Sequence, residues 1–217
     1  MSDGGSWGNK ENIAGQTACV HPDNNRKFPA SMPDTLALEF ANCAEPASLE
    51  LKGILDLTVP SGGNDGKAIH LVANADIADL STYGIGVANN GGGTDGQEYT
   101  FPNQAVAAGD HILVARDTSA MGSYLCDGDC STKFQHVLET DSHISQNGDD
   151  AIELFENGSV IETFGDPTTD GTGQDWEYKD SWAYKVVNNT WTYGEVDCTD
   201  GSETSATSRC PYTVPPQ

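Results

Sequence analysis

The stretch from Asn147 to Gly165 constrains the fold of this chain more than any other part of it. Apolar side chains occur at 152–155 and again at 160–164, on either side of the pair Asn157-Gly158. Asn followed by Gly tolerates positive φ at both centres of a two-residue hairpin loop. Gly148 and Gly165 mark turns at the two outer ends. The sequence therefore predicts a β-hairpin here.

Other short apolar blocks, separated by turn signals, predict further strands. Over 49–59 the leucines and the valine share one parity, which predicts a long strand, and Gly53 suggests a bulge in it. The remaining predicted strands are 36–40, 68–72, 83–87, 98–101, 111–115 and 133–138, with a second hairpin from 181–187 and 190–193. A helical turn or a tight connection is expected over 76–80, and no amphipathic helix of ten residues is expected.

This spacing of strands is typical of an all-β fold, a β-sandwich of roughly eight to ten strands. We expect three parts: an irregular, polar N-terminal arm over 1–45, the sandwich over 46–195, and a C-terminal tail over 196–217. The apolar residues fall in periodic blocks, a pattern that disordered acidic chains lack. A folded domain is therefore expected despite the 24 glycines.

The charge of the chain limits its partners. The sequence has 33 acidic and 10 basic residues, a formal net charge of -23. Nucleic acid and anionic membrane surfaces both require a cationic footprint, so we expect neither as a partner. A cation, or a basic protein partner, suits this charge better. The first residues do not resemble a signal peptide, so a secreted protein would have lost its signal or be part of a longer chain.

Six cysteines indicate an oxidised, extracellular protein, because their spacing does not match a zinc finger. Fifteen pairings are possible for six cysteines, and we favour the local one. It joins Cys19 to Cys43, Cys126 to Cys130 and Cys198 to Cys210, so that each bond pins a loop or a terminus.

Two segments carry a family resemblance. The first is 92–102, an aromatic strand with a Phe-Pro turn, which leads into the Gly-polar pair and apolar strand of 106–116. The second is 148–155 together with 160–165. Both resemble the lamin-tail domain family, as found in modules of secreted bacterial nucleases and cell-surface proteins, over about 45–190. The resemblance implies an immunoglobulin-like sandwich that acts as a non-catalytic module.

The segment 166–177 has the spacing of an EF-hand calcium loop, in which oxygen ligands and a central Gly recur at fixed positions. Position 3 is Thr, position 8 lacks an apolar anchor and no flanking helices are expected, so an acidic turn between strands is the alternative. The candidate ligands are Asp166, Thr168, Asp170, Thr172 and Glu177.

Two further acidic pairs have competing interpretations. Asp127 and Asp129 lie between Cys126 and Cys130 and would suit either a cation or a solvated turn. Asp149 and Asp150 resemble an acid–base pair, but adjacent strand residues point apart. We expect them instead to accept hydrogen bonds from backbone N–H groups of the turn.

Aromatic residues are concentrated between 176 and 193. Exposed rings there would stack on a glycan or anchor a protein interface, and Trp176, Tyr178 and Trp182 are the candidates. We favour the alternative, that Trp182, Tyr184, Trp191 and Tyr193 line one face of the second hairpin and are half-buried.

No motif of nucleophilic, phosphate-binding or metal-dependent catalysis occurs in the sequence, and the five histidines are scattered. We therefore expect a secreted, non-catalytic binding or structural module, stabilised by calcium, that contacts a protein or assembles with itself. The alternatives are a subunit of an extracellular filament or surface layer, and an accessory domain of a secreted nuclease or hydrolase.

Overall fold

The computed structural model describes residues 47–59, 63–186 and 189–213. The predicted arm, its strand at 36–40 and the pair Cys19–Cys43 lie outside the described residues. In the described part, strands are β1 (Leu49–Asp56), β2 (Lys67–Ala73), β3 (Tyr83–Ala88), β4 (Tyr99–Thr100), β5 (His111–Ala115), β6 (His136–Glu139), β7 (Ala151–Glu156), β8 (Ser159–Phe164), β9 (Ser181–Val186) and β10 (Thr190–Tyr193). The helices are α2 (Thr118–Cys126) and five 3₁₀ turns: Leu80–Thr82, Asn89–Gly91, Cys130–Thr132, Asp141–His143 and Ser205–Thr207.

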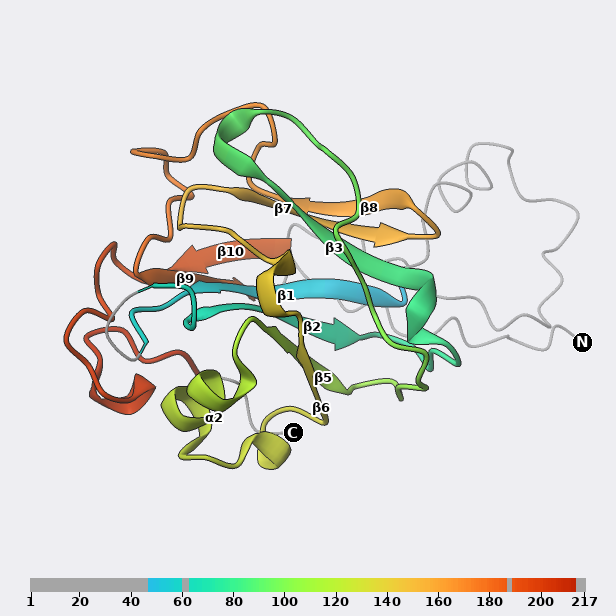
Figure 1. The fold of residues 1–217 in the computed structure, drawn as a ribbon, viewed down its shortest axis with the longest axis horizontal. Coiled ribbons are helices and arrows are strands. Elements are labelled where there is room, and N and C mark those ends of the chain that lie inside the picture. The colour runs from blue at the N-terminus through green and yellow to red at the C-terminus, as the bar shows by residue number, and fades with distance from the viewer. Residues whose placement is uncertain (1–46, 60–62, 187–188, 214–217) are drawn as a thin grey trace, which may run out of the picture. The chain divides into compact units, whose positions relative to one another are not determined.

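The strands form two sheets that face each other (Figure 1). The larger has six strands in the order β10-β9-β1-β2-β5-β6, and the smaller has four in the order β4-β3-β7-β8. The β5–β6 pair is parallel, and the other pairs are antiparallel. The prediction of an all-β sandwich is confirmed.

Both predicted hairpins are present. Strands β7 and β8 pair across Asn157 and Gly158, whose φ values of 50° and 75° are the two positive values that this turn requires. Strands β9 and β10 form the second hairpin. Its register pairs Trp191 with Lys185 and Tyr193 with Ala183. Because paired residues share a face, Trp191 and Tyr193 lie on the face opposite to Trp182 and Tyr184, and the prediction of one shared aromatic face is wrong.

A β-bulge divides β1 into two halves. The pairing with β2 shifts register between Leu51 and Gly53, with Lys52 as the extra residue. A single extra residue reverses the alternation of side chains. Leu51 thus faces the space between the sheets, whereas Leu55 faces outward. The predicted bulge is confirmed, and it sends the leucines of 49–59 to both faces of the sheet.

The larger sheet is therefore buried on both faces. One core lies between the sheets and includes Leu51, Ile85 and Ile152. A second core lies on the outer face of the larger sheet, where Leu55 and Leu113 pack with residues of α2 and with Tyr212. This gives the sandwich a third layer over part of its surface.

Helix α2 belongs to this third layer, and the sequence did not predict it. Its nine residues are polar, small or buried without a clear period, so the pattern of an amphipathic helix is absent. The local ends are well defined: Asp117 accepts a hydrogen bond from the amide of Ala120, and Asp127 adopts the left-handed conformation after the last turn. The disulfide from Cys126 to Cys130, predicted from sequence, closes the connection that follows.

The C-terminal tail is packed as part of the domain. The predicted disulfide joins Cys198 to Cys210, and the indole of Trp182 donates a hydrogen bond to the Cys210 carbonyl at 2.8 Å. Tyr212 is 5 % exposed and lies over Gly53 of the bulge. A Cβ atom at Gly53 would stand 1.9 Å from the Tyr212 hydroxyl oxygen. The tail can dock there because position 53 has no side chain.

We therefore expect Gly53→Ala to destabilise the domain by about 1–3 kcal/mol, because the added methyl group overpacks this contact. The matched control is Gly122→Ala in α2, where a Cβ would meet nothing within 4 Å. The control should be neutral or stabilising by about 0.5–1 kcal/mol, since Gly is a poor helix former. Chemical denaturation of both variants measures the difference, and equal effects would contradict the packing of Tyr212 on Gly53.

Candidate functional site

The loop that resembles an EF-hand uses its acidic residues as turn caps. Asp166 Oδ1 accepts hydrogen bonds from the amide and the hydroxyl of Thr168 at 2.9 and 2.8 Å. Asp170 Oδ1 accepts from the amide of Thr172 at 2.9 Å. These bonds, led by the one from each backbone amide, lower the pKa values of Asp166 and Asp170. Both carboxylates are therefore held in their own turns.

The other candidate ligands of this loop have separate partners. Glu177 Oε2 accepts from the amide of Gly173 at 2.8 Å, and the Thr172 hydroxyl donates to Asp149 at 2.8 Å. Thr168 points its hydroxyl at Asp166. Within the described residues, the acidic side chains of 166–177 are not among those grouped closely enough to share an ion. Calcium binding by this loop stays a prediction.

A different acidic cluster comes together at the junction of β9 and the tail. Asp180, Asp197 and Asp200 each place a carboxylate oxygen within 4.8 Å of the others. In the described part of the chain, these three carboxylates are the ones that lie close enough together to hold a metal ion. We call it the acidic cluster.

Neighbouring side chains already compensate part of its charge. Lys179 Nζ lies 2.9 Å from Asp197 and 3.4 Å from Asp180. The Thr58 hydroxyl lies 2.8 Å from Asp180 Oδ1 and 2.7 Å from Asp200 Oδ1. One hydroxyl proton serves only one of these two oxygens. The cluster has no signature in the sequence, because the fold and the Cys198–Cys210 disulfide bring separate segments together.

Asp127 and Asp129 lie at the disulfide-closed turn after α2. Asp127 is the residue with φ of 52° that ends the helix. Asp129 Oδ1 accepts from the amide of Ser131 at 3.0 Å, and this bond lowers its pKa. Both residues are exposed and neither belongs to the acidic cluster. Their hydrogen bonds fit the solvated-turn interpretation, and no ion is needed to explain them.

Asp150 holds two loops together. Its Oδ1 accepts from the amide of Asn90 at 2.7 Å, and its Oδ2 accepts from the amide of Asn147 at 2.9 Å. Burial is the main cause of its raised pKa, which the two amide bonds partly offset. The prediction that this acidic pair satisfies backbone N–H groups is confirmed for Asp150. The amide of Asn90 comes from a distant segment that the local pattern did not indicate.

The three aromatic candidates have structural contacts. Tyr178 is fully buried and donates a hydrogen bond to the Asp150 carbonyl at 2.9 Å. Trp176 packs against Phe164, where side chains at Gly165 and Gly171 would collide with its ring. Both Trp176 and Trp182 are partly exposed. Only these two remain available for surface contacts with a glycan or a protein.

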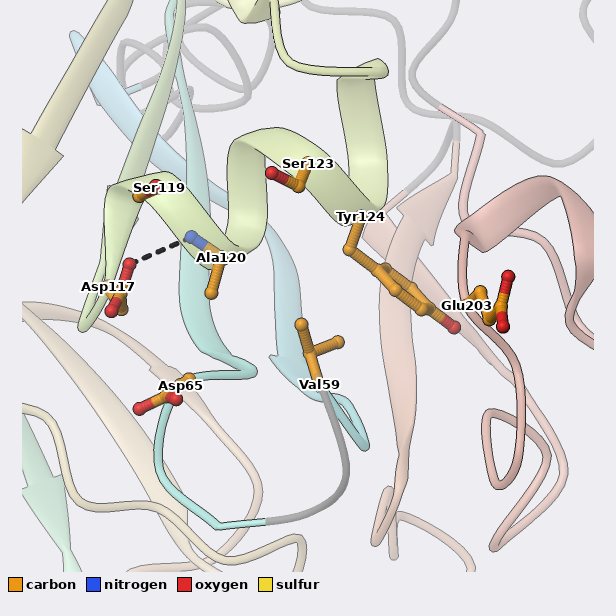
Figure 2. A pocket seen from close by; sticks show the side chains of 8 residues that line it. All are labelled: Val59, Asp65, Asp117, Ser119, Ala120, Ser123, Tyr124 and Glu203. Carbon is orange, nitrogen blue, oxygen red and sulfur yellow. Dashed lines mark hydrogen bonds between the residues drawn. The ribbon is translucent and has the colours of Figure 1, made fainter.

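A hollow of about 370 Å³ lies beside the start of α2. Figure 2 shows Asp65 and Asp117 at one end and Glu203 near Tyr124 at the other. The Asp117 carboxylate already caps the helix. The three carboxylates do not belong to a group close enough to share an ion in the described residues.

A chain of hydrogen bonds on the outer face of the larger sheet was not predicted. His70 Nδ1 lies 2.8 Å from the Tyr212 hydroxyl, and His70 Nε2 lies 2.6 Å from His111 Nδ1. His111 reaches a groove of about 500 Å³, which we call the β1–β9 groove. Its lining residues are Glu50, Lys52, Val72, Asn74, His111, Tyr184 and Val186. The sequence showed only scattered histidines, since their proximity depends on the register of β2 and β5.

Burial lowers the pKa of both imidazoles. His70 is 0 % exposed, and its pKa is well below the ordinary value because of desolvation, with further lowering by His111 and Lys52. His111 is half-buried, and desolvation, then Lys52, lower its pKa, while Asp110 raises it. Each imidazole therefore takes up its proton more readily in the unfolded chain.

No known family model matches the chain, and comparison with curated proteins finds no similar sequence. In the described residues, no helix is both long and apolar enough to pass through a bilayer.

The low pKa of His70 makes stability depend on pH. Below pH 6.5, His70 binds a proton in the unfolded state but not in the folded state. The free energy of unfolding therefore falls as pH falls. We expect His70 to account for a loss of about 1 kcal/mol between pH 6.5 and 5.5. Urea denaturation at both pH values, compared with His70→Gln, measures it. An identical pH dependence in the variant would contradict the assignment.

Proposed function

We propose that this protein is a secreted, non-catalytic binding or structural module. The observation that carries the proposal is the use of its conspicuous carboxylates as structural acceptors. Asp150 binds two loop amides, and Asp166 and Asp170 cap their own turns. Residues that resembled an acid–base pair or calcium ligands therefore stabilise loops between strands. Two disulfides within the described residues are consistent with an oxidising extracellular environment.

Glu162 supports the same interpretation. Its Oε2 accepts a hydrogen bond from the Leu51 amide at 2.8 Å, and its Oε1 pairs with Lys185. Glu162 belongs to β8 of the smaller sheet, whereas Leu51 and Lys185 belong to the larger one. Lys185 is nearly buried, so its pairing compensates a charge that would otherwise be costly. Here too the acidic residue joins parts of the fold.

Family membership remains a proposal. The motifs at 92–116 and 148–165 fall on β4, β5, β7 and β8 of a sandwich, as a lamin-tail module would require. The family function, mediating contact with a protein or a surface, agrees with a module of this kind. The net charge of -23 continues to argue against nucleic acid and anionic membranes as partners.

Calcium is the cation that we propose for this module. Three carboxylates and a threonine hydroxyl supply the hard oxygen ligands that calcium prefers, and the acidic cluster concentrates them at one place. A bound ion would replace Lys179 as the counter-charge. It would join β9 to the tail, next to the Cys198–Cys210 disulfide.

Thermal melting with calcium and with chelator tests this proposal, because a ligand of the folded state raises its stability. We expect millimolar calcium to raise the melting temperature of the wild type and of Asp170→Asn, but not of Asp200→Asn. The reverse order of the two variants would place calcium in the 166–177 loop. A melting temperature that calcium leaves unchanged would rule out both sites.

A filament or surface-layer subunit is the second candidate function. Strands β8 and β10 are edges of their sheets, and Val160 and Tyr193 on them are 42 % and 36 % exposed. Unpaired edges with exposed apolar residues favour association between copies. An accessory domain of a secreted nuclease or hydrolase rests on the family resemblance alone.

Sedimentation of the full chain over a range of concentrations separates these functions. A monomer at all concentrations favours a binding module, and growth into large species favours assembly. Hydrolysis of bis-(p-nitrophenyl) phosphate or of p-nitrophenyl glycosides by the purified chain would contradict a non-catalytic module.

A further inference from the structure

The β1–β9 groove contains a lysine, Lys52, that has no acidic partner among the described residues. In the described residues, Lys67, Lys179 and Lys185 pair with carboxylates, and Lys133 donates to the carbonyl of Leu125. Lys52 has no such oxygen acceptor in that part of the chain, and its ammonium lies 5.4 Å from the centre of the Tyr184 ring. In a chain with 33 acids and 10 bases, a lysine left over an aromatic ring at a groove is unusual.

The second hydrogen-bond donor of the groove is His111, and its tautomer follows from its neighbours. In the described residues the buried Tyr212 hydroxyl has one hydrogen-bond partner, His70 Nδ1. The hydroxyl proton has an acceptor only if the Tyr212 hydroxyl donates this hydrogen bond and His70 Nδ1 accepts it. His70 Nε2 then carries the proton of the neutral ring and donates to His111 Nδ1. His111, neutral as well, must carry its own proton on Nε2.

This chain of bonds leaves His111 with one available group, an N–H donor on Nε2. Its other nitrogen is occupied by His70. Lys52 lines the same groove as His111. The lining of the groove thus contains two hydrogen-bond donors, Lys52 and His111. A group with two acceptor oxygens and a negative charge matches this pair.

The rest of the groove is largely apolar. Val72 and the ring of Tyr184 are partly exposed, and Val186 is 37 % exposed. Tyr212 packs edge-on against Tyr184, with ring centroids 5.8 Å apart. A volume of about 500 Å³ suits a small molecule, because ligand sites of this size combine apolar walls with a few polar groups.

We propose that the β1–β9 groove binds a carboxylate that carries an apolar group, as in an acylated amino acid or the C-terminus of a peptide. Lys52 and His111 bind the carboxylate oxygens, and Val72, Val186 and the Tyr184 ring contact the apolar group. His70 and Tyr212 act as positioning residues, because they fix the tautomer of His111. This site goes beyond the proposed structural role and does not depend on calcium.

The electrostatic field of the chain limits the charge of such a ligand. At a net charge of -23, a multiply charged anion would be repelled as it approaches. A ligand with a single carboxylate and an apolar group is repelled less. Salt also screens the distant charges more than the direct contacts. Glu50, the acid that lines the groove, is itself near Lys185, at 3.5 Å. One carboxylate is therefore the favoured ligand class.

The test titrates the full chain with N-acetyl-L-leucine and follows the ¹⁵N and ¹H signals of Lys52 and His111. We expect saturable shifts at these residues, and no saturation with N-acetyl-L-leucinamide, which has the same shape without the charge. A tetrapeptide that ends in leucine serves as a second probe. Stronger binding of the peptide indicates a C-terminus as the ligand, and stronger binding of the free acid indicates a small molecule.

Two variants test whether the charge of Lys52 contributes to binding. Lys52→Met retains the aliphatic chain and removes the charge, so the affinity for N-acetyl-L-leucine should fall about tenfold, the effect of one charge-assisted hydrogen bond. Lys179→Met makes the same change at the acidic cluster and should leave the affinity unchanged. Equal binding of acid and amide, no saturation by either acid probe, or an unchanged affinity in Lys52→Met would each overturn the proposal.

The role of the positioning residues has a separate readout. Tyr212→Phe removes the hydroxyl that fixes His70, so the ¹⁵N shifts of His111 should change from an Nε2-protonated ring to a mixture of tautomers. Affinity should fall several-fold in parallel. A loss of stability with an unchanged His111 tautomer would show that Tyr212 acts only through packing.

Discussion

The extra residue in β1 is the constraint on which most of this structure depends. The bulge at Lys52 lets one strand contribute to two cores, since Leu51 faces the smaller sheet and Leu55 faces α2. It also takes the Leu51 amide out of the ladder with β9, whose pairing begins at Gly53, and Glu162 accepts its hydrogen bond from the opposite sheet. A backbone group that would otherwise be unsatisfied thus becomes a link between the sheets.

The same bulge organises the outer face. Gly53 leaves room for Tyr212, and the tail is then fixed by the Cys198–Cys210 disulfide and by the bond from Trp182. Lys52 extends on that face over Tyr184 and lines the same groove as His111, which is bonded through His70 to Tyr212. The covered half of the face stabilises the domain, and the open half is the β1–β9 groove. A structural irregularity and a candidate binding site therefore share one origin.

The sequence predicted those features that local patterns determine. Asn157-Gly158 determined a hairpin, because few other residue pairs accept two positive φ values, and Gly53 marked the bulge. Other features depend on distant contacts. No local pattern in the sequence indicates the direction of the bulge, the register that places Trp191 opposite Lys185, or helix α2. The acidic cluster and the pair His70–His111 could not be predicted either, since each joins residues from separate segments.

The central claim is that the bulge at Lys52 seats the C-terminal tail on the larger sheet. Nuclear Overhauser effects between the α protons of Gly53 and the ring protons of Tyr212 test it most directly. The structure requires strong effects, with the glycine protons shifted by the ring current of the tyrosine, because the hydroxyl lies where a Cβ of residue 53 would be. Their absence in the folded, oxidised protein, with ordinary Gly53 shifts, would contradict the account.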